Sequence, residues 1–324
     1  MSQASRNKNF IVVNDPTSPP PGLERGVYAI GNFDGAHLGH CAVIERTKKL
    51  AAELDAPSAV LTFEPHPADF FAGRPVVFRL TPQSIKARAF GELGLDGIVT
   101  LTFDAALAAL TAEDFVARVL VERLGVGAVV IGWDFHFGKG RGGSPAFLVE
   151  AGRRHGFRVE VIDKVEDVGG PDTPAISSTA IRKALEAGDV ETAGRLLGRD
   201  YSIVGKVIEG QKLGRTLGFP TANIALEPAN RLAHGIYAVE ATVDSRRFGG
   251  VASFGTRPTV DNGPPLLEVF LFDFSGDLYG KTMEVAFKAY LRPELKFDGL
   301  AALKAQMDAD ASQARELLAA PRRI

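Results

Sequence analysis

Two histidines, His37 and His40, lie three residues apart at the end of a glycine-rich stretch, residues 31–40 (GNFDGAHLGH). Residues three apart on a helix share one face. Two imidazoles beside a phosphate can donate hydrogen bonds to the negative charge that develops on it. This arrangement suits nucleotidyl transfer, a reaction that needs positioning and charge stabilisation rather than a covalent intermediate. The alternative for the pair is a role as surface or helix-capping residues.

This stretch must be positioned by the elements on either side of it. The apolar run 27–30 (VYAI) predicts a buried strand, and the apolar-periodic run 38–54 predicts a helix. The unpaired N–H groups at a helix N-terminus carry partial positive charge, so a phosphate is stabilised there. Gly31 and Gly35 lack a Cβ, which lets a backbone or a ligand approach closely. The context therefore favours a phosphate site.

Three further stretches of the first half have patterns that suit a nucleotide. Residues 63–67 (FEPHP) predict a rigid turn, because each proline fixes φ and restricts the residue before it. Residues 132–143 (GWDFHFGKGRGG) interleave glycines with aromatic rings and Asp134, so this loop could hold a phosphate or a ring. Residues 176–182 (ISSTAIR) place hydroxyls at a helix start with Arg182 one turn in, which fits either capping or a grip on a triphosphate.

Two stretches of the second half could also do chemistry. Between residues 205 and 223 glycines flank basic residues, and Thr221 and Asn223 of a P-T-A-N sequence offer oxygen ligands of the kind that Mg²⁺ takes beside ATP phosphates. The G-K-[ST] ending of a Walker loop is absent, and a hairpin loop with a polar turn is the alternative. Glu268 is a carboxylate within the apolar run 266–272 (LLEVFLF). If its face of the strand is outward, it is only a solvated residue.

Alternating elements predict the architecture of the first half. Short apolar runs bounded by turn signals predict strands buried on both faces, and their alternation with helices implies a parallel sheet between two helical layers. Ligands bind beyond the carboxyl ends of such strands, where the stretches above fall. The predicted strands are Val27–Gly31, Ala59–Phe63, Gly97–Thr102, Ala128–Gly132 and Arg158–Ile162. The predicted helices are His40–Leu54, Pro82–Leu93, Ala112–Leu124 and Pro145–His155.

The pattern changes after about residue 200. Strands follow one another without helices, so the second sheet is predicted to be antiparallel and to close as a small barrel. The predicted strands are Val204–Ile208, Gly235–Val243, Phe248–Phe254, Leu266–Phe272 and Met283–Tyr290. The last strand is predicted to direct to one side Met283, Val285, Phe287 and Ala289. A final helix is predicted over about residues 298–318, with an apolar stripe of Leu300, Leu303, Met307 and Ala311.

The composition of the 324 residues limits the class of protein. The length suggests two domains, and 45% hydrophobic with 23% charged residues is ordinary for a globular protein. A formal charge of −2 gives no reason to expect nucleic acid or an anionic membrane surface as a partner. Cys41 is the only cysteine, so no intramolecular disulfide can form and a cytoplasmic location is expected. The short run 10–13 predicts neither a signal peptide nor a membrane span.

Residues 31–40 resemble the H-x-G-H nucleotidyltransferase superfamily, and their longer form is similar to the front module of the bacterial bifunctional riboflavin kinase/FMN adenylyltransferase family. The likeness covers nearly everything from about Val27 to Arg315. The chain carries, in the family's order, F-E-P-H-P, G-x-D-F-x-F-G, I-S-S-T-x-I-R, G-R-x-x-G-F-P-T-A-N, G-x-R-P-T, E-x-x-x-x-D-F, D-L-Y-G and L-R-P-E-x-K-F. Three positions depart from the family pattern: His136 replaces a common arginine, Ser253 an asparagine and Phe270 a histidine.

Pattern and resemblance together predict an α/β N-terminal domain with a doubly wound parallel sheet, and a C-terminal antiparallel β-barrel with a terminal helix. The expected boundaries are 1–187 for the FMN adenylyltransferase domain, 188–199 for a linker and 200–324 for the riboflavin kinase domain. The implied activity is ATP-dependent phosphorylation of riboflavin to FMN, then adenylylation of FMN to FAD with release of pyrophosphate. Mg²⁺ is the expected cofactor. The expected partners are the small molecules riboflavin, FMN and ATP, without nucleic acid or membrane, and the oligomeric state is left open.

The resemblance also implies roles for single residues. Glu268 is expected as the general base of the kinase, and His37 and His40 as the catalytic groups of the adenylyltransferase. The ATP of the adenylyltransferase is expected at Gly31, Phe33, Gly35, His37, His40, Asp134, Ser177, Thr179 and Arg182. The ATP of the kinase is expected at Gly210, Gly214, Arg215, Thr221 and Asn223, of which the last two are also the expected metal ligands.

Two other functions stay open. One is an H-x-G-H adenylyltransferase for another phosphorylated metabolite, against which the P-T-A-N stretch and Glu268 argue. The other is a flavin-binding or flavin-sensing protein with a degenerate kinase, for which Ser253 and Phe270 leave room. Incubation of the purified protein with riboflavin, ATP and Mg²⁺ distinguishes the three functions. The bifunctional enzyme should form FMN and then FAD, an adenylyltransferase for another metabolite should not convert flavin, and a flavin sensor should bind flavin without converting it.

Overall fold

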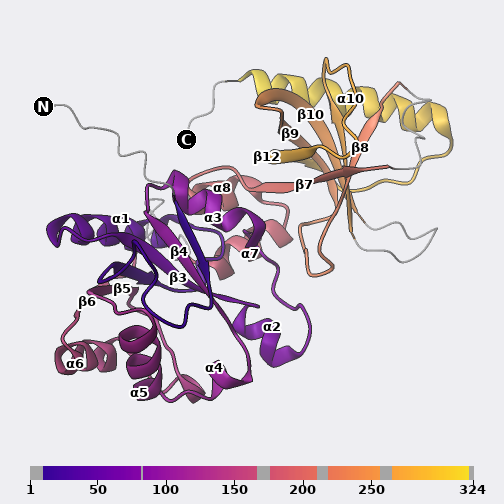
Figure 1. Ribbon diagram of the computed structural model, residues 1–324. Coiled ribbons are helices and arrows are strands. Elements are labelled where there is room, and N and C mark those ends of the chain that lie inside the picture. The colour runs from indigo at the N-terminus through magenta and orange to yellow at the C-terminus, as the bar shows by residue number, and fades with distance from the viewer. Residues whose placement is uncertain (1–9, 82, 166–175, 210–217, 256–264, 321–324) are drawn as a thin grey trace, which may run out of the picture. The chain divides into compact units, whose positions relative to one another are not determined.

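The computed structural model describes residues 10–81, 83–165, 176–209, 218–255 and 265–320, and it forms two compact units (Figure 1). The first unit consists of Met1–Val77 and Thr81–Ile176, and the second of Phe78–Leu80 and Ser177–Ile324. This geometric division lies ahead of the predicted boundary after residue 187, so helix α7 (Ser178–Glu186) counts with the second unit. Which residue range carries which activity stays a prediction.

Within the described residues, a six-stranded parallel sheet forms the centre of the first unit. Its strands are β1 (Ile11–Asn14), β2 (Val27–Ile30), β3 (Ser58–Glu64), β4 (Gly97–Thr102), β5 (Ala128–Gly132) and β6 (Arg158–Ile162). Their order is β1-β4-β3-β2-β5-β6, and the pairings between neighbours are parallel. The predicted doubly wound parallel sheet is confirmed. The edge strand β1 is an addition to the predicted strands.

The chain reverses its direction across the sheet between β2 and β5. From β2 it continues to β3 and β4 on one side, and it then crosses to β5 and β6 on the other side. In an open α/β sheet, ligands bind at such a reversal, outside the carboxyl ends of the strands. Ile30 is the last residue of β2, so the stretch 31–40 begins at this position. Topology thus places the two histidines where a ligand is expected.

Helices join the strands of the first unit. Their bounds are α1 (Leu38–Glu53), α2 (Pro67–Ala72), α3 (Gln83–Glu92), α4 (Ala105–Ala109), α5 (Ala112–Asp114), the π-helix η1 (Phe115–Arg123), the 3₁₀ turn η2 (Lys139–Arg141) and α6 (Pro145–His155). The helix predicted over 112–124 is therefore mostly a π-helix. Helix α2 starts inside FEPHP, where only a turn is predicted. His66 caps it, because the His66 Nδ1 accepts a hydrogen bond from the Ala68 N–H at 3.1 Å.

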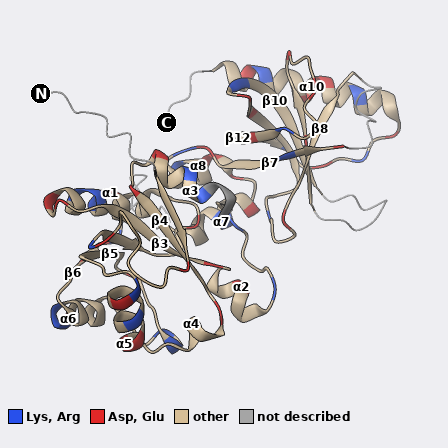
Figure 2. Cartoon of the chain, viewed as in Figure 1, with Lys and Arg blue, Asp and Glu red and all other residues tan. Residues whose placement is uncertain are grey.

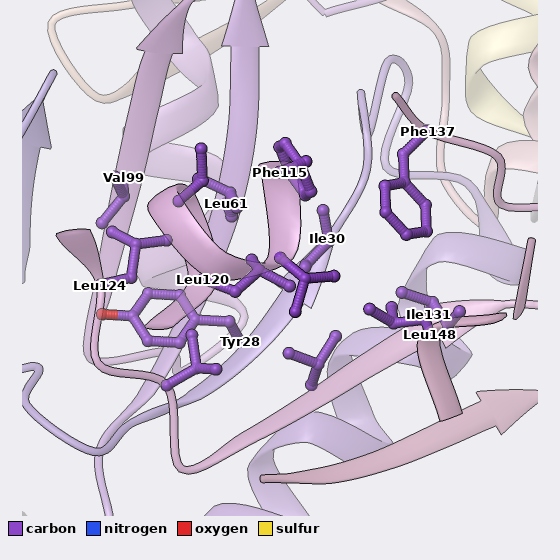
Figure 3. Close-up of a cluster of buried hydrophobic side chains, with 14 of the residues drawn as sticks. Tyr28, Ile30, Leu61, Val99, Phe115, Leu120, Leu124, Ile131, Phe137 and Leu148 are labelled. Atoms are coloured by element: carbon purple, nitrogen blue, oxygen red, sulfur yellow. The ribbon is translucent and has the colours of Figure 1, made fainter. Parts of the chain in front are cut away.

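Alternate residues of β2 face two separate hydrophobic cores. Tyr28 and Ile30 point into one core, together with side chains of the π-helix and α6 (Figure 3). Val27 and Ala29 belong to the other core, where α1 and α3 pack on the sheet. Each of these four β2 residues is buried, as predicted for a strand between two helical layers.

The second unit contains a closed antiparallel barrel. Its described strands are β7 (Ser202–Ile208), β8 (Thr221–Ala225), β9 (Gly235–Val243), β10 (Arg246–Gly255), β11 (Leu266–Leu271) and β12 (Thr282–Arg292). They follow the order β10-β11-β8-β7-β12-β9, and the pairing of β9 with β10 closes the barrel. Helices α8 (Val190–Leu197) and α10 (Leu300–Ala319) flank it in the chain. The predicted barrel with a terminal helix is confirmed, and β8 is an addition to the predicted strands.

Strand β12 departs from the predicted alternation near its end. Met283, Val285 and Phe287 are fully buried, in agreement with the prediction. A bulge between Phe287 and Ala289 shifts the register with β9, and Ala289 packs with Ala314 of α10. An extra residue in one strand turns the side chains that follow to the opposite face. The prediction is therefore right up to Phe287 and wrong for Ala289.

Helix α10 packs on the outside of the barrel against β9, β10 and β12. Three members of its predicted stripe, Leu303, Met307 and Ala311, line a pocket on that face. The fourth, Leu300, is 59% exposed at the start of the helix and does not line the pocket. A single apolar residue in the first turn of a helix often lies beyond the surface that the helix covers.

Acidic and basic residues are interspersed along the elements of both units (Figure 2). On α1, Arg46 donates hydrogen bonds to Glu53 of the same helix and to Glu160 of β6. The distance from the Arg46 Nη2 to the Glu160 Oε1 is 2.9 Å. This cross-element ion pair ties α1 to the edge strand of the sheet.

Candidate active sites

The turn between β2 and α1 has a backbone that few residues adopt. Phe33, Gly35 and Ala36 lie in the left-handed region, with φ of 48°, 93° and 42°. Residues with a Cβ pay a conformational cost there. The carboxylate of Asp34, which is 2% exposed, accepts a hydrogen bond from the Thr81 N–H at 2.9 Å. Strained backbone that its surroundings hold in place is characteristic of functional sites.

His37 and His40 lie side by side at the start of α1. Their rings stack with centroids 3.6 Å apart and planes 16° apart. His37 is the N-cap rather than a helical residue, and its Nδ1 accepts a hydrogen bond from the His40 N–H at 3.2 Å. A neutral imidazole that accepts through Nδ1 carries its proton on Nε2, so the Nε2–H of His37 is a donor. The two imidazoles thus lie together, as predicted, and His37 precedes the helix as its N-cap.

Two glycines allow the aromatic rings of the turn to pack against the backbone. A Cβ on Gly31 would lie 3.3 Å from the ring of Phe33, and a Cβ on Gly39 would lie 3.1 Å from the Cε1 of His37. The same Cβ on Gly39 would lie 3.8 Å from the carbonyl oxygen of Ile176. Ile176 therefore approaches the start of α1, and Ser177 follows it in the chain. Both glycines are consistent with a role in shaping the turn.

The aromatic loop after β5 divides into a buried part and an exposed part. Phe137 is 8% exposed and packs against Phe115 and Phe147, so this ring belongs to the core. Trp133 is 52% exposed, and Asp134 is exposed with its Oδ1 3.2 Å from the position of a Cβ on Gly132. Only the exposed residues of this loop therefore remain candidates for binding a phosphate or a ring. The role of Asp134 at ATP stays a prediction.

The hydroxyl cluster at the start of α7 performs helix capping. The Ser177 Oγ accepts a hydrogen bond from the Ala180 N–H at 3.2 Å. The Arg182 Nε donates to the Phe78 carbonyl oxygen at 2.8 Å, and Thr179 is exposed. These three predicted ATP residues belong to the second compact unit, whereas the histidines belong to the first. Binding of a triphosphate by Ser177, Thr179 and Arg182 stays a prediction.

In the barrel, the P-T-A-N residues and Glu268 lie on two paired strands. Thr221 is the first residue of β8 and lies opposite Phe270 of β11, while Asn223 lies opposite Glu268. Leu267, Val269 and Leu271 are buried in alternation with Glu268 and Phe270, so the latter two face outward. Glu268 therefore lies on the outward face of β11, which is one of the two orientations considered from the sequence. Gly210, Gly214 and Arg215 lie outside the described residues, as do residues 256–259 of G-x-R-P-T.

Glu268 is half-buried on this outward face, because it lines an open pocket of about 310 Å³ to which α10 and the segment after β12 also contribute. Nine of its fifteen lining residues are apolar and six are polar or charged, and a mostly apolar wall with some polar groups is the usual make-up of a small-molecule site. Glu268 lies in this pocket, with Ser253 of β10 and Asn223 of β8 opposite it on the two neighbouring strands. The pocket is lined by Phe219, Thr221, Ile236, Val251, Ser253, Glu268, Phe270, Arg292, Glu294, Leu295, Phe297, Leu303, Met307, Asp310 and Ala311.

An ion pair that the sequence does not reveal forms part of the pocket. Arg292 at the end of β12 binds Asp310 of α10 through two hydrogen bonds, of 2.9 and 2.7 Å. Asp310 is 3% exposed, so the pair is shielded from water. It fastens α10 to the barrel beside the pocket. The L-R-P-E motif contains Arg292, but its partner stands 18 residues further on and is identified only by contact.

The donors on this face are oxygen atoms of the type that Mg²⁺ prefers. Thr221 contributes a hydroxyl, Asn223 an amide oxygen and Glu268 a carboxylate. Mg²⁺ keeps several water or phosphate ligands and needs only one or two from the protein. Among the described residues, no group of three or more His, Cys, Asp or Glu side chains forms a metal site. A hydroxyl and an amide oxygen from the protein fit a Mg²⁺ that takes its other ligands from phosphate or water.

The parallel α/β sheet with its H-x-G-H turn and the closed barrel with its P-T-A-N strand are together the architecture of a two-domain transferase. Two family models match the chain: FAD synthetase over residues 20–180 and riboflavin kinase over residues 197–318. The bifunctional riboflavin kinase/FMN adenylyltransferase of Pseudomonas fluorescens is 45% identical over 294 residues, 90% of this chain and 93% of that protein. The chain belongs to the bifunctional riboflavin kinase/FMN adenylyltransferase family, whose work is flavin cofactor biosynthesis.

Other relatives agree with this assignment. The bifunctional riboflavin kinase/FMN adenylyltransferase of Escherichia coli strain K12 is 40% identical over 90% of this chain and 92% of that protein. A crystal structure described as a macrolide-efflux protein from Streptococcus pneumoniae superposes with a TM-score of 0.82, at 30% identity, over 94% of this chain and 99% of that one. The predicted family and enzyme class are confirmed. Over the described ranges, no helix has the length and hydrophobicity needed to cross a membrane.

Proposed function

We propose that the first unit transfers AMP from ATP to FMN, giving FAD and pyrophosphate, and that the barrel of the second unit phosphorylates riboflavin to FMN. The observation that carries this proposal most directly is the pocket that places Thr221, Phe270 and Glu268 around one cavity. A kinase for a flavin needs an apolar space for the ring system and polar groups at one end for the phosphates. This pocket has a mostly apolar lining and also contains polar side chains.

In the kinase, Glu268 accepts the proton of the primary hydroxyl of riboflavin as its oxygen attacks the γ-phosphorus of ATP. The P–O bond to ADP breaks in the same step, and ADP leaves. Phe219 and Phe270 pack edge-to-face, with ring centroids 4.8 Å apart, and provide an apolar wall for the flavin ring. Gly210, Gly214 and Arg215 are proposed at the ATP phosphates on the basis of motif position alone.

The proposed metal is Mg²⁺ on the ATP phosphates, with Thr221 and Asn223 as its protein ligands. When bound, it neutralises phosphate charge and orients the transferring group. The two side chains share the outward face of β8 with spacing i, i+2, so both point toward the side on which Glu268 lies. This shared face supports the proposal that the hydroxyl of Thr221 and the amide oxygen of Asn223 bind the same cation.

In the adenylyltransferase, the phosphate of FMN attacks the α-phosphorus of ATP, and pyrophosphate leaves. His37 and His40 donate hydrogen bonds to the oxygens on which charge accumulates. The strained turn with Gly31, Phe33 and Gly35 holds the two rings in position. Asp134, Ser177, Thr179 and Arg182 are proposed to contact the same ATP, in keeping with their motif positions.

One incubation tests the proposal. Purified protein is supplied with riboflavin, ATP and Mg²⁺, and flavins are separated by chromatography over time. The expected result is that FMN appears first and FAD second, and that omission of Mg²⁺ stops both. Riboflavin that binds without conversion would identify a flavin sensor. An absence of any flavin turnover or binding would point to an adenylyltransferase for another metabolite.

A further inference from the structure

Lys86 of α3 is a charged side chain with no exposed surface, and it lies beside the turn that carries the histidines. Its Nζ donates to the Glu64 Oε1 at 3.0 Å and to the Asn32 carbonyl oxygen at 3.1 Å. Glu64 is the last residue of β3, and Asn32 follows β2. A buried ammonium is costly unless it is paired and hydrogen-bonded. Lys86 meets this condition by binding the carboxyl ends of two adjacent strands.

The carbonyl of Asn32 is held from two sides. Besides the bond from Lys86, it accepts one from the Thr62 Oγ1 at 3.2 Å. A carbonyl oxygen has two lone pairs, so both are occupied. The peptide that joins Asn32 to Phe33 therefore has its orientation determined by groups on α3 and β3. The next residue, Phe33, is the one with φ of 48°.

Helix α3 contacts the same turn a second time, through Phe90. Lys86 and Phe90 are four residues apart and share one face of the helix. The ring of Phe90 packs edge-to-face on that of Phe33, with centroids 5.9 Å and planes 80° apart. Phe33 in turn packs on His40, with centroids 5.1 Å and planes 68° apart. A continuous path of contacts leads from Lys86 to the imidazole.

We propose that Lys86 is a positioning residue for adenylyl transfer. It keeps the Asn32 carbonyl at the end of β2, which maintains the strained Phe33 and, through the contact of the two rings, the orientation of His40. An ammonium suits this task because its three donors can bind both strand ends at once. This inference rests on the proposed function of the first unit. It assigns to Lys86 no contact with substrate.

Lys86→Met tests the inference, because methionine retains an unbranched side chain and removes the three donors. Displacement of a catalytic group by about 1 Å can cost about 100-fold in rate. We expect kcat for FAD formation from FMN and ATP to fall about 100-fold, while KM for both substrates changes less than about threefold. Formation of FMN from riboflavin is expected to be unchanged, because the kinase pocket lies in the other unit.

Lys48→Met is the matched control. Lys48 lies on α1 of the same unit, is partly exposed and forms a surface ion pair with Glu45 at 2.7 Å. This variant is expected to keep its kcat for FAD formation. A second readout is the ¹³C-edited spectrum of the six histidines, in which the contact with the ring of Phe33 is expected to shift the His40 ring signals. Those signals are expected to move in Lys86→Met and to stay in Lys48→Met.

A folded Lys86→Met protein with kcat within twofold of the unmodified chain, or with unmoved His40 signals, would overturn the inference. If Lys86→Met does not fold, Thr62→Val decides, because it removes the other donor to the same carbonyl. A lower kcat at unchanged KM then supports the inference, and an unchanged kcat overturns it. Failure of the proposed function is distinguishable, since the unmodified chain itself would then form no FAD.

Discussion

At the scale of single residues, the stacked imidazoles of His37 and His40 lead to the most direct prediction for the first unit. The double variant His37→Ala, His40→Ala removes both donors and should lower FAD formation by a factor of about 100 or more, since loss of one such donor typically costs that much. FMN formation should remain, because Glu268 lies in the barrel. Chromatography of the flavins from one reaction measures both activities. Normal FAD synthesis would contradict the assignment of the histidines.

Glu268 gives the corresponding prediction for the barrel. Glu268→Gln keeps the shape of the side chain and removes the proton acceptor. A general base contributes about 10² to 10⁴ in rate, so a fall of that size is expected in kcat for FMN formation, with riboflavin binding nearly intact. Kinase assays and flavin fluorescence titration measure the two quantities.

Glu284→Gln is a suitable control for this substitution. Glu284 is also a strand carboxylate of the barrel, and it accepts a hydrogen bond from Ser202 at 3.0 Å outside the pocket. Its kcat is expected to stay unchanged. Full activity of Glu268→Gln would contradict its role as general base. Catalysis would then depend only on the metal and on the orientation of the riboflavin hydroxyl.

At the scale of elements, the ion pair between Arg46 and Glu160 predicts an acid-sensitive attachment of α1 to β6. Hydrogen bonding from Arg46, followed by the charges of Arg46 and Arg158, holds the pKa of Glu160 below its ordinary value. A carboxyl whose pKa is lowered by folding stabilises the protein above its unfolded pKa of about 4.3, and this contribution is lost as the pH falls through the folded pKa.

Glu160→Gln should therefore lower the midpoint of thermal unfolding at pH 7, where the carboxylate is charged. The difference from the unmodified chain should shrink as the pH falls below about 4 and through the lowered folded pKa, beyond which the glutamate is neutral in both states. Thermal unfolding followed by circular dichroism across this range measures the difference. Equal midpoints at pH 7 would show that the pair contributes nothing to the attachment of α1.

At the scale of the whole molecule, the two units are expected to separate with one activity each. Residues 200–324 form the barrel and α10 and are predicted to phosphorylate riboflavin alone. Helices α7 and α8 also pack in this unit: Leu196 and Leu197 are buried, α8 contacts β12, and the Ala233 N–H donates to the Leu185 carbonyl.

A protein of residues 177–324 should therefore unfold at a higher temperature than one of residues 200–324, because exposing buried leucines costs stability. Both lack Phe78–Leu80, so the comparison isolates the two helices. Both should form FMN from riboflavin, ATP and Mg²⁺. If the longer protein is folded but inactive, the kinase requires residues of the first unit, and the predicted separation of activities is wrong.

The sequence by itself determined the family, the order of most elements and the identity of the chemical groups. Strands buried on both faces, such as β2 and β5, read as short apolar runs because each side chain meets a helical layer. The glycine-rich turn and the P-T-A-N residues are local patterns, and the chemistry of imidazole, hydroxyl and carboxylate groups follows from their types. Two strands, β1 and β8, have too weak a local pattern to be predicted. Strand β1 has four residues with alternating exposure at a sheet edge, and β8 begins within P-T-A-N, whose polar residues resemble a turn.

Only the tertiary structure decided what surrounds these groups. The alternation in β11 shows that Glu268 and Val269 point to opposite faces of the strand. Whether the outer face is open surface or part of a pocket depends on α10, which begins some 30 residues further along the chain. Lys86 likewise resembles any helical lysine in the sequence. Its burial depends on Glu64 and Asn32, which folding brings together at the carboxyl ends of β3 and β2. The burial of a side chain and its hydrogen-bond partners arise from contacts between distant segments. A local sequence pattern therefore identifies the functional groups, and long-range packing determines what those groups can do.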